Sequence, residues 1–164
     1  MMGAGKTATG KILAKLTETD FLDLDSEIEA QAHLSINEIF RQKGEPFFRG
    51  EEKKALDRSL KLNHAVVATG GGIVLDPRNV ESMRHSGRMI YLAATFETLW
   101  ARVREKRDRP LLAVADPEKV FYQLFQVRKP LYESACEWKI DTDGLTPGEV
   151  AEKIVTQHLK STSK

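Results

Sequence analysis

The sequence has a single cysteine, Cys136, and no long apolar run. One thiol cannot form an internal disulfide, and no histidine has the spacing of a metal site or a catalytic triad. Nothing approaches the roughly 18 apolar residues that a membrane span needs, so no membrane partner is expected. Neither a signal peptide nor a transit segment is recognisable, which makes the cytoplasm the expected location.

An excess of charge of one sign is also lacking, because 25 basic and 24 acidic residues leave a net charge of +1. Nucleic-acid binders usually carry a clear basic excess, so no nucleic-acid partner is expected. Any site for a small anion must therefore be built locally, from a few residues.

The chain does have apolar stretches suited to buried strands, and these alternate with helical patterns. This order predicts an α/β fold with a parallel sheet. The length predicts one domain over residues 1–164, and a monomer is expected. Ser35 and Glu38 match a capping box and predict a helix start. The predicted helices cover 6–18, 26–43 in two short parts, 45–60, 118–134 and segments that begin near 77, 96 and 147; the predicted strands lie near 21–24, 65–69, 88–92 and 138–141.

The segment Gly3-Ala4-Gly5-Lys6-Thr7 leads directly into the first predicted helix and is most of a P-loop. Glycines let backbone N–H groups curl around phosphate oxygens at a helix N-terminus. Lys6 can then reach the β- and γ-phosphates of ATP, and the Thr7 hydroxyl can bind Mg²⁺. A chance Gly-Lys-Thr at a helix start is the alternative, since the first glycine of the full pattern and the strand before it have no counterpart in the sequence.

Asp23 and Asp25 lie two residues apart at the C-terminal end of a predicted strand, where open α/β sheets place their ligands. One carboxylate can hold Mg²⁺ through water while the other faces a substrate hydroxyl. A solvated acidic turn is the alternative explanation.

Two arginines are candidates for binding a small organic acid. Arg49 lies three residues before Glu52 on a predicted helix, so Glu52 can orient its guanidinium. Arg128 is the second candidate, because two planar guanidinium groups suit a carboxylate. Each of these arginines could instead be a solvated surface residue.

Three consecutive glycines, Gly70-Gly71-Gly72, follow the strand predicted at 65–69. They permit close approach of the backbone to a ligand and also backbone dihedrals that other residues avoid. The charged segment from about 103 to 117 suits a mobile flap, from which Arg109 could reach the phosphates. Arg102 is a second candidate for contact with the phosphates.

Taken together, these motifs resemble the shikimate kinase family in order and spacing, over nearly the whole chain. The motifs that carry the resemblance are Met-Gly-Ala-Gly-Lys-Thr, Leu22-Asp23-Leu24-Asp25, Phe48-Arg49 with Glu52, Ala68-Thr69-Gly70-Gly71-Gly72, Arg109-Pro110-Leu111-Leu112 and Arg128-x-Pro130-Leu131-Tyr132. The resemblance implies transfer of the γ-phosphate of ATP to the 3-hydroxyl of shikimate, with Mg²⁺ as cofactor, in the biosynthesis of chorismate and aromatic amino acids.

The resemblance also implies a role for each site residue. Catalysis would involve Lys6, Asp25 and Arg109, and the metal would be held by Thr7 and Asp23. The nucleotide would contact Gly3, Ala4, Gly5, Lys6, Thr7, Arg102 and Arg109. Shikimate would contact Asp25, Arg49, Gly70, Gly71, Gly72 and Arg128, with 26–60 as its binding helices and about 103–117 as a closing lid.

The implied fold is a P-loop, nucleoside-monophosphate-kinase-like arrangement of three layers around a central parallel sheet. The family has five strands, and its first, central strand has no counterpart in this sequence. Losing such a strand would cost roughly 1.5–3 kcal/mol for each buried residue, so we expect translation to begin upstream. Two alternatives remain: a non-catalytic relative that binds nucleotide or shikimate, and a P-loop kinase for another small hydroxy acid such as gluconate or an amino analogue of shikimate.

Overall fold

The computed structural model of the chain describes residues 1–104, 112 and 114–159. Its elements follow the predicted order, and the predicted alternation of strands and helices is confirmed. The helices are α1 (Lys6–Thr17), α2 (Leu24–Ala32), α3 (Ile36–Ser59), α4 (Pro77–Ser86), α5 (Phe96–Val103), α6 (Pro117–Ala135) and α7 (Pro147–Ile154). The strands are β1 (Asp20–Asp23), β2 (Ala65–Ala68), β3 (Ile90–Ala93) and β4 (Trp138–Asp141), with short helical turns at η1 (Ile73–Leu75) and η3 (Val155–Leu159).

The helix starts that matter for the site are fixed by side-chain caps. The predicted capping box of α3 is present, because Ser35 and Glu38 satisfy each other's backbone N–H groups. Asp23 caps α2 in the same manner, by accepting from the N–H groups of Asp25 and Ser26. Gly44 has non-helical dihedrals (φ 78°, ψ 168°) and breaks α3 into two helical parts, as the separate predictions for 26–43 and 45–60 require.

The strands pair in parallel, as predicted, but those in the described part of the chain form two separate pairs and not one sheet. β1 pairs with β2, from Asp20 beside Ala65 to Asp23 beside Ala68. β3 pairs with β4, from Ile90 beside Trp138 to Ala93 beside Asp141. The expected central sheet, which lacks its first strand here, is therefore interrupted between β2 and β3 in the described residues.

A groove with a volume of about 250 Å³ lies between the two strand pairs. Side chains of β2 and β3, among them Val67, Ile90 and Leu92, line it together with Met1. Among the described residues, the edges of β2 and β3 that face away from their partners carry no backbone hydrogen bond. The apolar residues of β2 are accordingly only half-buried up to Val67.

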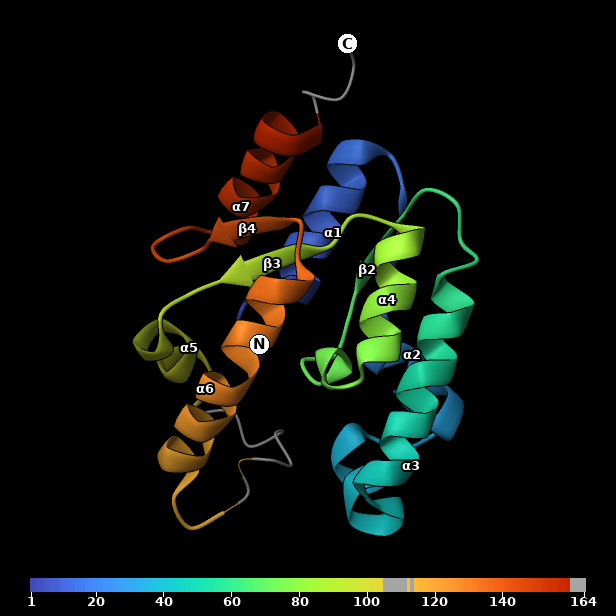
Figure 1. Ribbon diagram of the computed structural model, residues 1–164, viewed down its shortest axis with the longest axis vertical. Coiled ribbons are helices and arrows are strands. Elements are labelled where there is room, and N and C mark those ends of the chain that lie inside the picture. Colours follow the sequence, from blue (N-terminus) through green and yellow to red (C-terminus); the bar gives the residue numbers. More distant parts are fainter. Residues whose placement is uncertain (105–111, 113, 160–164) are drawn as a thin grey trace.

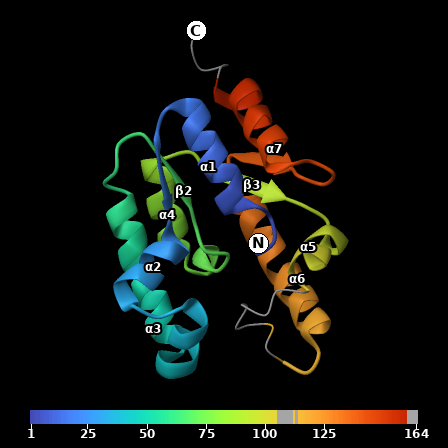
Figure 2. The same cartoon turned by 180° about the vertical axis from the view of Figure 1, so that it is seen from behind.

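The helices lie on both sides of the strands. α4 and α6 cover the face that is turned to the viewer in Figure 1. α1 and α7 pack against each other on the opposite face, which Figure 2 turns to the front, and α1 also contacts β1 and β2. The chain begins between the two strand pairs, near the middle of the molecule in Figure 1, where Met1 is buried.

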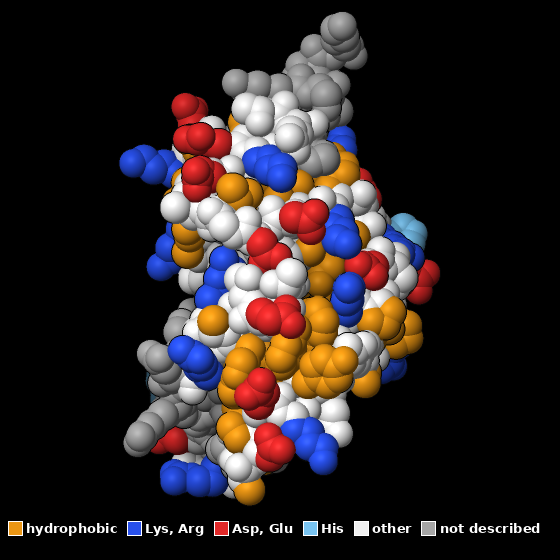
Figure 3. Space-filling view, turned by 90° about the vertical axis from the view of Figure 1, so that its left-hand side faces the viewer, with side chains coloured by type: hydrophobic (Ala, Val, Ile, Leu, Met, Phe, Trp, Pro, Cys, Tyr) orange, Lys and Arg blue, Asp and Glu red, His pale blue; other side chains and the backbone are white. Residues whose placement is uncertain are grey.

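Acidic and basic side chains are interspersed over the face drawn in Figure 3, so this face has no field of one sign. Apolar side chains gather in its lower half. Within residues 1–104, 112 and 114–159, no helix is both long enough and apolar enough to cross a membrane.

Candidate active site

The loop at residues 3–7, named the phosphate loop after its sequence motif, contains two glycines with left-handed backbone. Gly3 has φ 79° and Gly5 has φ 84°, a region that side chains disfavour. Gly3 also packs tightly on α5, since a Cβ there would lie 2.8 Å from Cγ1 of Val103. Gly5 is the N-cap of α1, so the first N–H groups of that helix have no partner within it and point toward the loop. This arrangement suits an anion.

A hydroxyl and a carboxylate meet beside this loop. Oγ1 of Thr7 donates to Oδ2 of Asp23 at 2.6 Å, while Oδ1 of Asp23 accepts from the N–H of Asp25 at 3.1 Å. No cluster of three or more His, Cys, Asp or Glu side chains that could hold a metal occurs among the residues described. Mg²⁺ typically takes only one or two protein oxygens and completes its shell with water and substrate phosphates. The oxygens of Thr7 and Asp23 fit that requirement.

A cavity of about 570 Å³ opens over the phosphate loop. Besides the loop, Asp23, Asp25, Arg102 and Pro147 contribute to its walls. The guanidinium of Arg102 donates to the carbonyl oxygens of Gly3 at 3.3 Å and of Thr142 at 3.4 Å. The structure therefore brings Arg102 to the phosphate loop, where the sequence predicts it.

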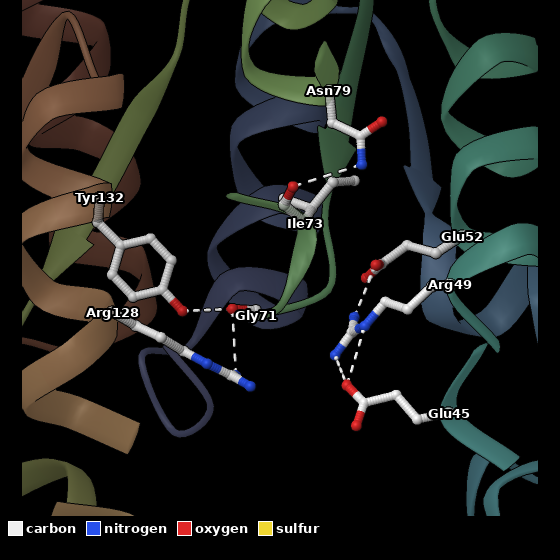
Figure 4. A network of polar contacts seen from close by, with 8 residues as sticks. All are labelled: Glu45, Arg49, Glu52, Gly71, Ile73, Asn79, Arg128 and Tyr132. Carbon is white, nitrogen blue, oxygen red and sulfur yellow. Dashed lines mark hydrogen bonds and ion pairs between the residues drawn. The ribbon is translucent and has the colours of Figure 1, made fainter. Parts of the chain in front are cut away.

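A second, smaller cavity of about 80 Å³ lies beside the first. Arg49 enters it from α3 and is held by two carboxylates, Oε2 of Glu52 at 2.7 Å and Oε1 of Glu45 at 2.8 Å (Figure 4). The predicted contact between Arg49 and Glu52 is confirmed. Glu45 was not anticipated, although its spacing of four residues from Arg49 on one helix could have indicated it.

Arg128 enters the same cavity from α6, opposite Arg49 (Figure 4). It is buried, with 4% of its surface exposed, and donates to the carbonyl oxygen of Gly71 at 3.3 Å. Tyr132, one turn further along α6, donates to the same oxygen at 2.5 Å. The Nε of Arg128 is buried and has no hydrogen-bond partner among the residues that the structure describes. A buried guanidinium with an unused donor is costly unless a ligand supplies the acceptor.

The three glycines form the floor between the two arginines, and the structure corrects one reason given for them. None of the three has a positive φ, so unusual dihedrals do not explain them. Lack of space explains two of them, because a Cβ on Gly72 would overlap the guanidinium of Arg49, and a Cβ on Gly70 would lie 2.6 Å from Oε1 of Glu52. A side chain at either position would displace the charged groups above it.

The two cavities share Met2, Asp25 and Gly71 as wall residues. The larger one has a loop whose free N–H groups suit an anion and two oxygens, of Thr7 and Asp23, that suit a metal, and the smaller one has two convergent arginines. Asp25 stands where the cavities meet, so its carboxylate can face groups bound on either side. This geometry suits the transfer of a phosphoryl group between two bound molecules.

Comparison with known proteins agrees with this geometry, since the family model of shikimate kinase matches residues 2–159. The chain belongs to the shikimate kinase family. Members of this family are ATP-dependent phosphotransferases. A shikimate kinase from Caldanaerobacter subterraneus subsp. tengcongensis is 41% identical over 159 residues, which are 97% of this chain and 92% of that protein. One from Caldicellulosiruptor saccharolyticus is 40% identical over 163 residues, 99% of this chain and 94% of the relative.

A solved structure agrees as well. The shikimate kinase from Acinetobacter baumannii in complex with shikimate superimposes with a TM-score of 0.95 at 36% identity, and the match covers 99% of this chain and 91% of that one. The α/β fold with parallel strands is therefore that of the shikimate kinase family.

Burial and neighbouring charges have opposing effects on the pKa values of the small cavity. Burial raises the pKa of Glu52, the cationic Arg49 lowers it, and the nearby Asp25 raises it. The pKa of Arg49 is raised in turn because both of its carboxylate partners stabilise the cation, against the opposing effect of burial. Burial also raises the pKa of Tyr132 to about 12, so this phenol stays a hydrogen-bond donor at neutral pH.

One predicted site residue, Arg109, lies outside the described residues, as does most of the predicted lid at 103–117. The other predicted site residues all line one or both of the two cavities. Tyr132 was overlooked as a functional residue, although it lies four residues after Arg128 and therefore on the same face of α6.

Proposed function

We propose that this chain transfers the γ-phosphate of ATP to the 3-hydroxyl of shikimate, giving ADP and shikimate 3-phosphate for the biosynthesis of chorismate and aromatic amino acids. The observation that carries the proposal is the meeting of an anion-binding cavity and an arginine-lined cavity at Asp25. Membership of the shikimate kinase family supports the choice of both substrates.

On the nucleotide side, the first N–H groups of α1 and the ammonium group of Lys6 would bind the phosphates. Thr7 and Asp23 would hold Mg²⁺, whose charge offsets the negative charge that develops on the phosphate oxygens when it is bound. Arg102 neighbours the loop through its bond to Gly3 and would face the same phosphates. For Arg109 the proposal rests on the sequence alone: it would close over the nucleotide from the lid at about 103–117.

On the acceptor side, Arg49 and Arg128 would bind the shikimate carboxylate from opposite walls. The unused, buried donor of Arg128 supports this role, because a carboxylate would satisfy it. The row Gly70-Gly71-Gly72 would lie beneath the ring, where no side chain competes for space. Asp25 would orient the 3-hydroxyl toward the phosphate and accept its proton as the new bond forms.

Shikimate-dependent release of ADP from MgATP tests this function directly. We expect turnover with shikimate and at least about 100-fold lower kcat/KM with gluconate or an amino analogue of shikimate, because an acid that leaves buried polar groups unpaired is rejected strongly. A preference for another acid would replace the proposed substrate. Ligand binding without any turnover would instead identify a non-catalytic relative. We further expect a cytoplasmic monomer, which gel filtration and cell fractionation would test.

The groove between the strand pairs supports a finer statement about the fold. We infer that the complete sheet has five parallel strands, and that its central position lies between β2 and β3, whose facing edges lack backbone partners. An apolar peptide of about six β-branched residues, which is the usual length of a strand, should bind there. It is expected to raise Tm by a few degrees at millimolar concentration. The same peptide with a central proline serves as the control, and equal effects of the two peptides would refute the inference.

A further inference from the structure

Glu52 uses only one of its two carboxylate oxygens within the protein. It is 1% exposed, and its Oε2 accepts from Arg49. The other oxygen, Oε1, is buried and receives no hydrogen bond from any residue that the structure describes. A buried carboxylate oxygen without a donor destabilises the free protein, so its presence at a substrate cavity needs a reason.

The direction of Oε1 is fixed by its distance to Gly70. A Cβ on Gly70 would lie 2.6 Å from Oε1 of Glu52 and 2.8 Å from Oδ1 of Asp25. Both oxygens therefore lie close to the same point above the glycine floor. Glu52 and Asp25 are both wall residues of the small cavity, which Arg49 and Arg128 also line. The unused oxygen thus faces the place where the acceptor would bind.

Arg49 alone does not explain this arrangement. Glu45 binds the same guanidinium through Nε and Nη2 but is exposed to solvent, so water can satisfy its remaining oxygen. A residue that only had to orient Arg49 could be exposed in the same way. Glu52 is buried, and its second oxygen is turned toward Gly70 and Asp25.

We propose that Oε1 of Glu52 accepts a hydrogen bond from one of the two shikimate hydroxyls that are not phosphorylated. The inference rests on the proposed function, and it makes Glu52 a residue that selects the substrate as well as one that positions Arg49. Asp25 would take the reacting hydroxyl and Glu52 a second one, so the paired carboxylates would recognise a polyol ring. An acid without the second hydroxyl would leave Oε1 unpaired in the closed complex.

The charged groups around Glu52 are compatible with this role. Arg49 from α3 and Arg128 from α6 are the cations that offset its charge, while Asp25 from α2 is the neighbouring anion. Tyr132 from α6 also lies within electrostatic reach of Glu52. Burial raises the pKa of Glu52 and the arginines oppose that rise, so a hydroxyl donor would help to stabilise the charged form.

The test combines enzyme variants with altered substrates. Shikimate and its 4-deoxy and 5-deoxy analogues are assayed for kcat and KM with the unmodified chain, with Glu52→Gln and with Glu45→Gln. The unmodified chain should lose about 10- to 100-fold in kcat/KM with one analogue, as expected for a lost hydrogen bond to a charged group. Glu52→Gln should lower kcat/KM for all three substrates by one common factor, because Arg49 loses a partner, and for shikimate by about a further 10- to 100-fold that is absent with that analogue. Glu45→Gln acts only through Arg49, so it should lower kcat/KM for all three substrates by one common factor.

Two results would overturn the inference while leaving the proposed function intact. One is an equal loss of kcat/KM for all three substrates in Glu52→Gln, which would show that Glu52 only positions Arg49. The other is that the unmodified chain phosphorylates both analogues with the same kcat/KM as shikimate. This result needs no variant, so it decides the question even if Glu52→Gln does not fold. Failure of the unmodified chain to phosphorylate shikimate would be a different result, which removes the proposed function and this inference with it.

Discussion

Replacing Asp25 by asparagine is expected to lower kcat for shikimate by about 10²- to 10⁴-fold, the usual contribution of a positioned general base. The amide has nearly the same shape and can still hold a hydroxyl, but it cannot accept the proton. KM for ATP should change by less than about 3-fold, because the phosphate loop and the Thr7–Asp23 pair are untouched. Steady-state kinetics with both substrates varied provides the measurement.

Asp23→Asn is the matched control for that variant, since it alters the neighbouring carboxylate. It should raise the Mg²⁺ concentration needed for half-maximal rate, whereas Asp25→Asn should leave that concentration unchanged. If Asp25→Asn kept more than about a tenth of the original kcat, Asp25 would not be the base. The proton would then have to pass to the phosphate or to water.

Replacing Arg49 by alanine is expected to raise KM for shikimate by about 100-fold and KM for ATP by less than about 3-fold, because charge-assisted hydrogen bonds to the carboxylate are lost. It should also destabilise the fold. Glu52 would remain buried without the cation that faces its Oε2, and breaking a buried pair from one side costs about 3–5 kcal/mol at most. Urea unfolding and steady-state kinetics measure the two effects separately.

Arg41→Ala is a suitable control, because Arg41 is an exposed arginine of the same helix. It should leave KM for shikimate unchanged and alter the free energy of unfolding by less than about 0.5 kcal/mol. Equal increases of both Michaelis constants in Arg49→Ala would argue against a carboxylate-binding role. Such a result would point to a general loss of structure around α3.

Much of the fold follows from local sequence signals. The capping box of Ser35 and Glu38 marks the start of α3, and Gly44 marks the break within it. The apolar run at 65–69 gives β2 nearly to the residue. The pairing of strands could not be read in this way, because it depends on which backbone edges meet in space. One central sheet was expected, and the described strands form two pairs.

In the site as well, features that depend on spacing along the chain could be predicted, and features that depend on tertiary packing could not. Gly3 to Thr7, Asp23 and Asp25 were found because their spacing along the chain already fits the chemistry of phosphate and metal. For the glycine floor, the special dihedrals are absent, and the room above Gly70 and Gly72 is taken by the side chains of Arg49, Glu52 and Asp25. Close approach of a ligand to these glycines stays a prediction. The unused oxygen of Glu52 had no signal in the sequence, because it depends on how α3 lies against Gly70.

The two oxygens of Asp23 are bonded to different parts of the site. Oδ2 is bonded to Thr7 at the phosphate loop, and Oδ1 is bonded to the backbone of Asp25, whose side chain faces the acceptor cavity. Binding of the nucleotide and its metal would change the contacts of Oδ2. Through Oδ1 this change would reach the first turn of α2, to which Asp25 belongs. We therefore expect nucleotide and shikimate to strengthen each other's binding by equal factors, as reciprocal coupling between two sites requires. The carboxylate of Asp23 alone would thus couple the binding of the two substrates.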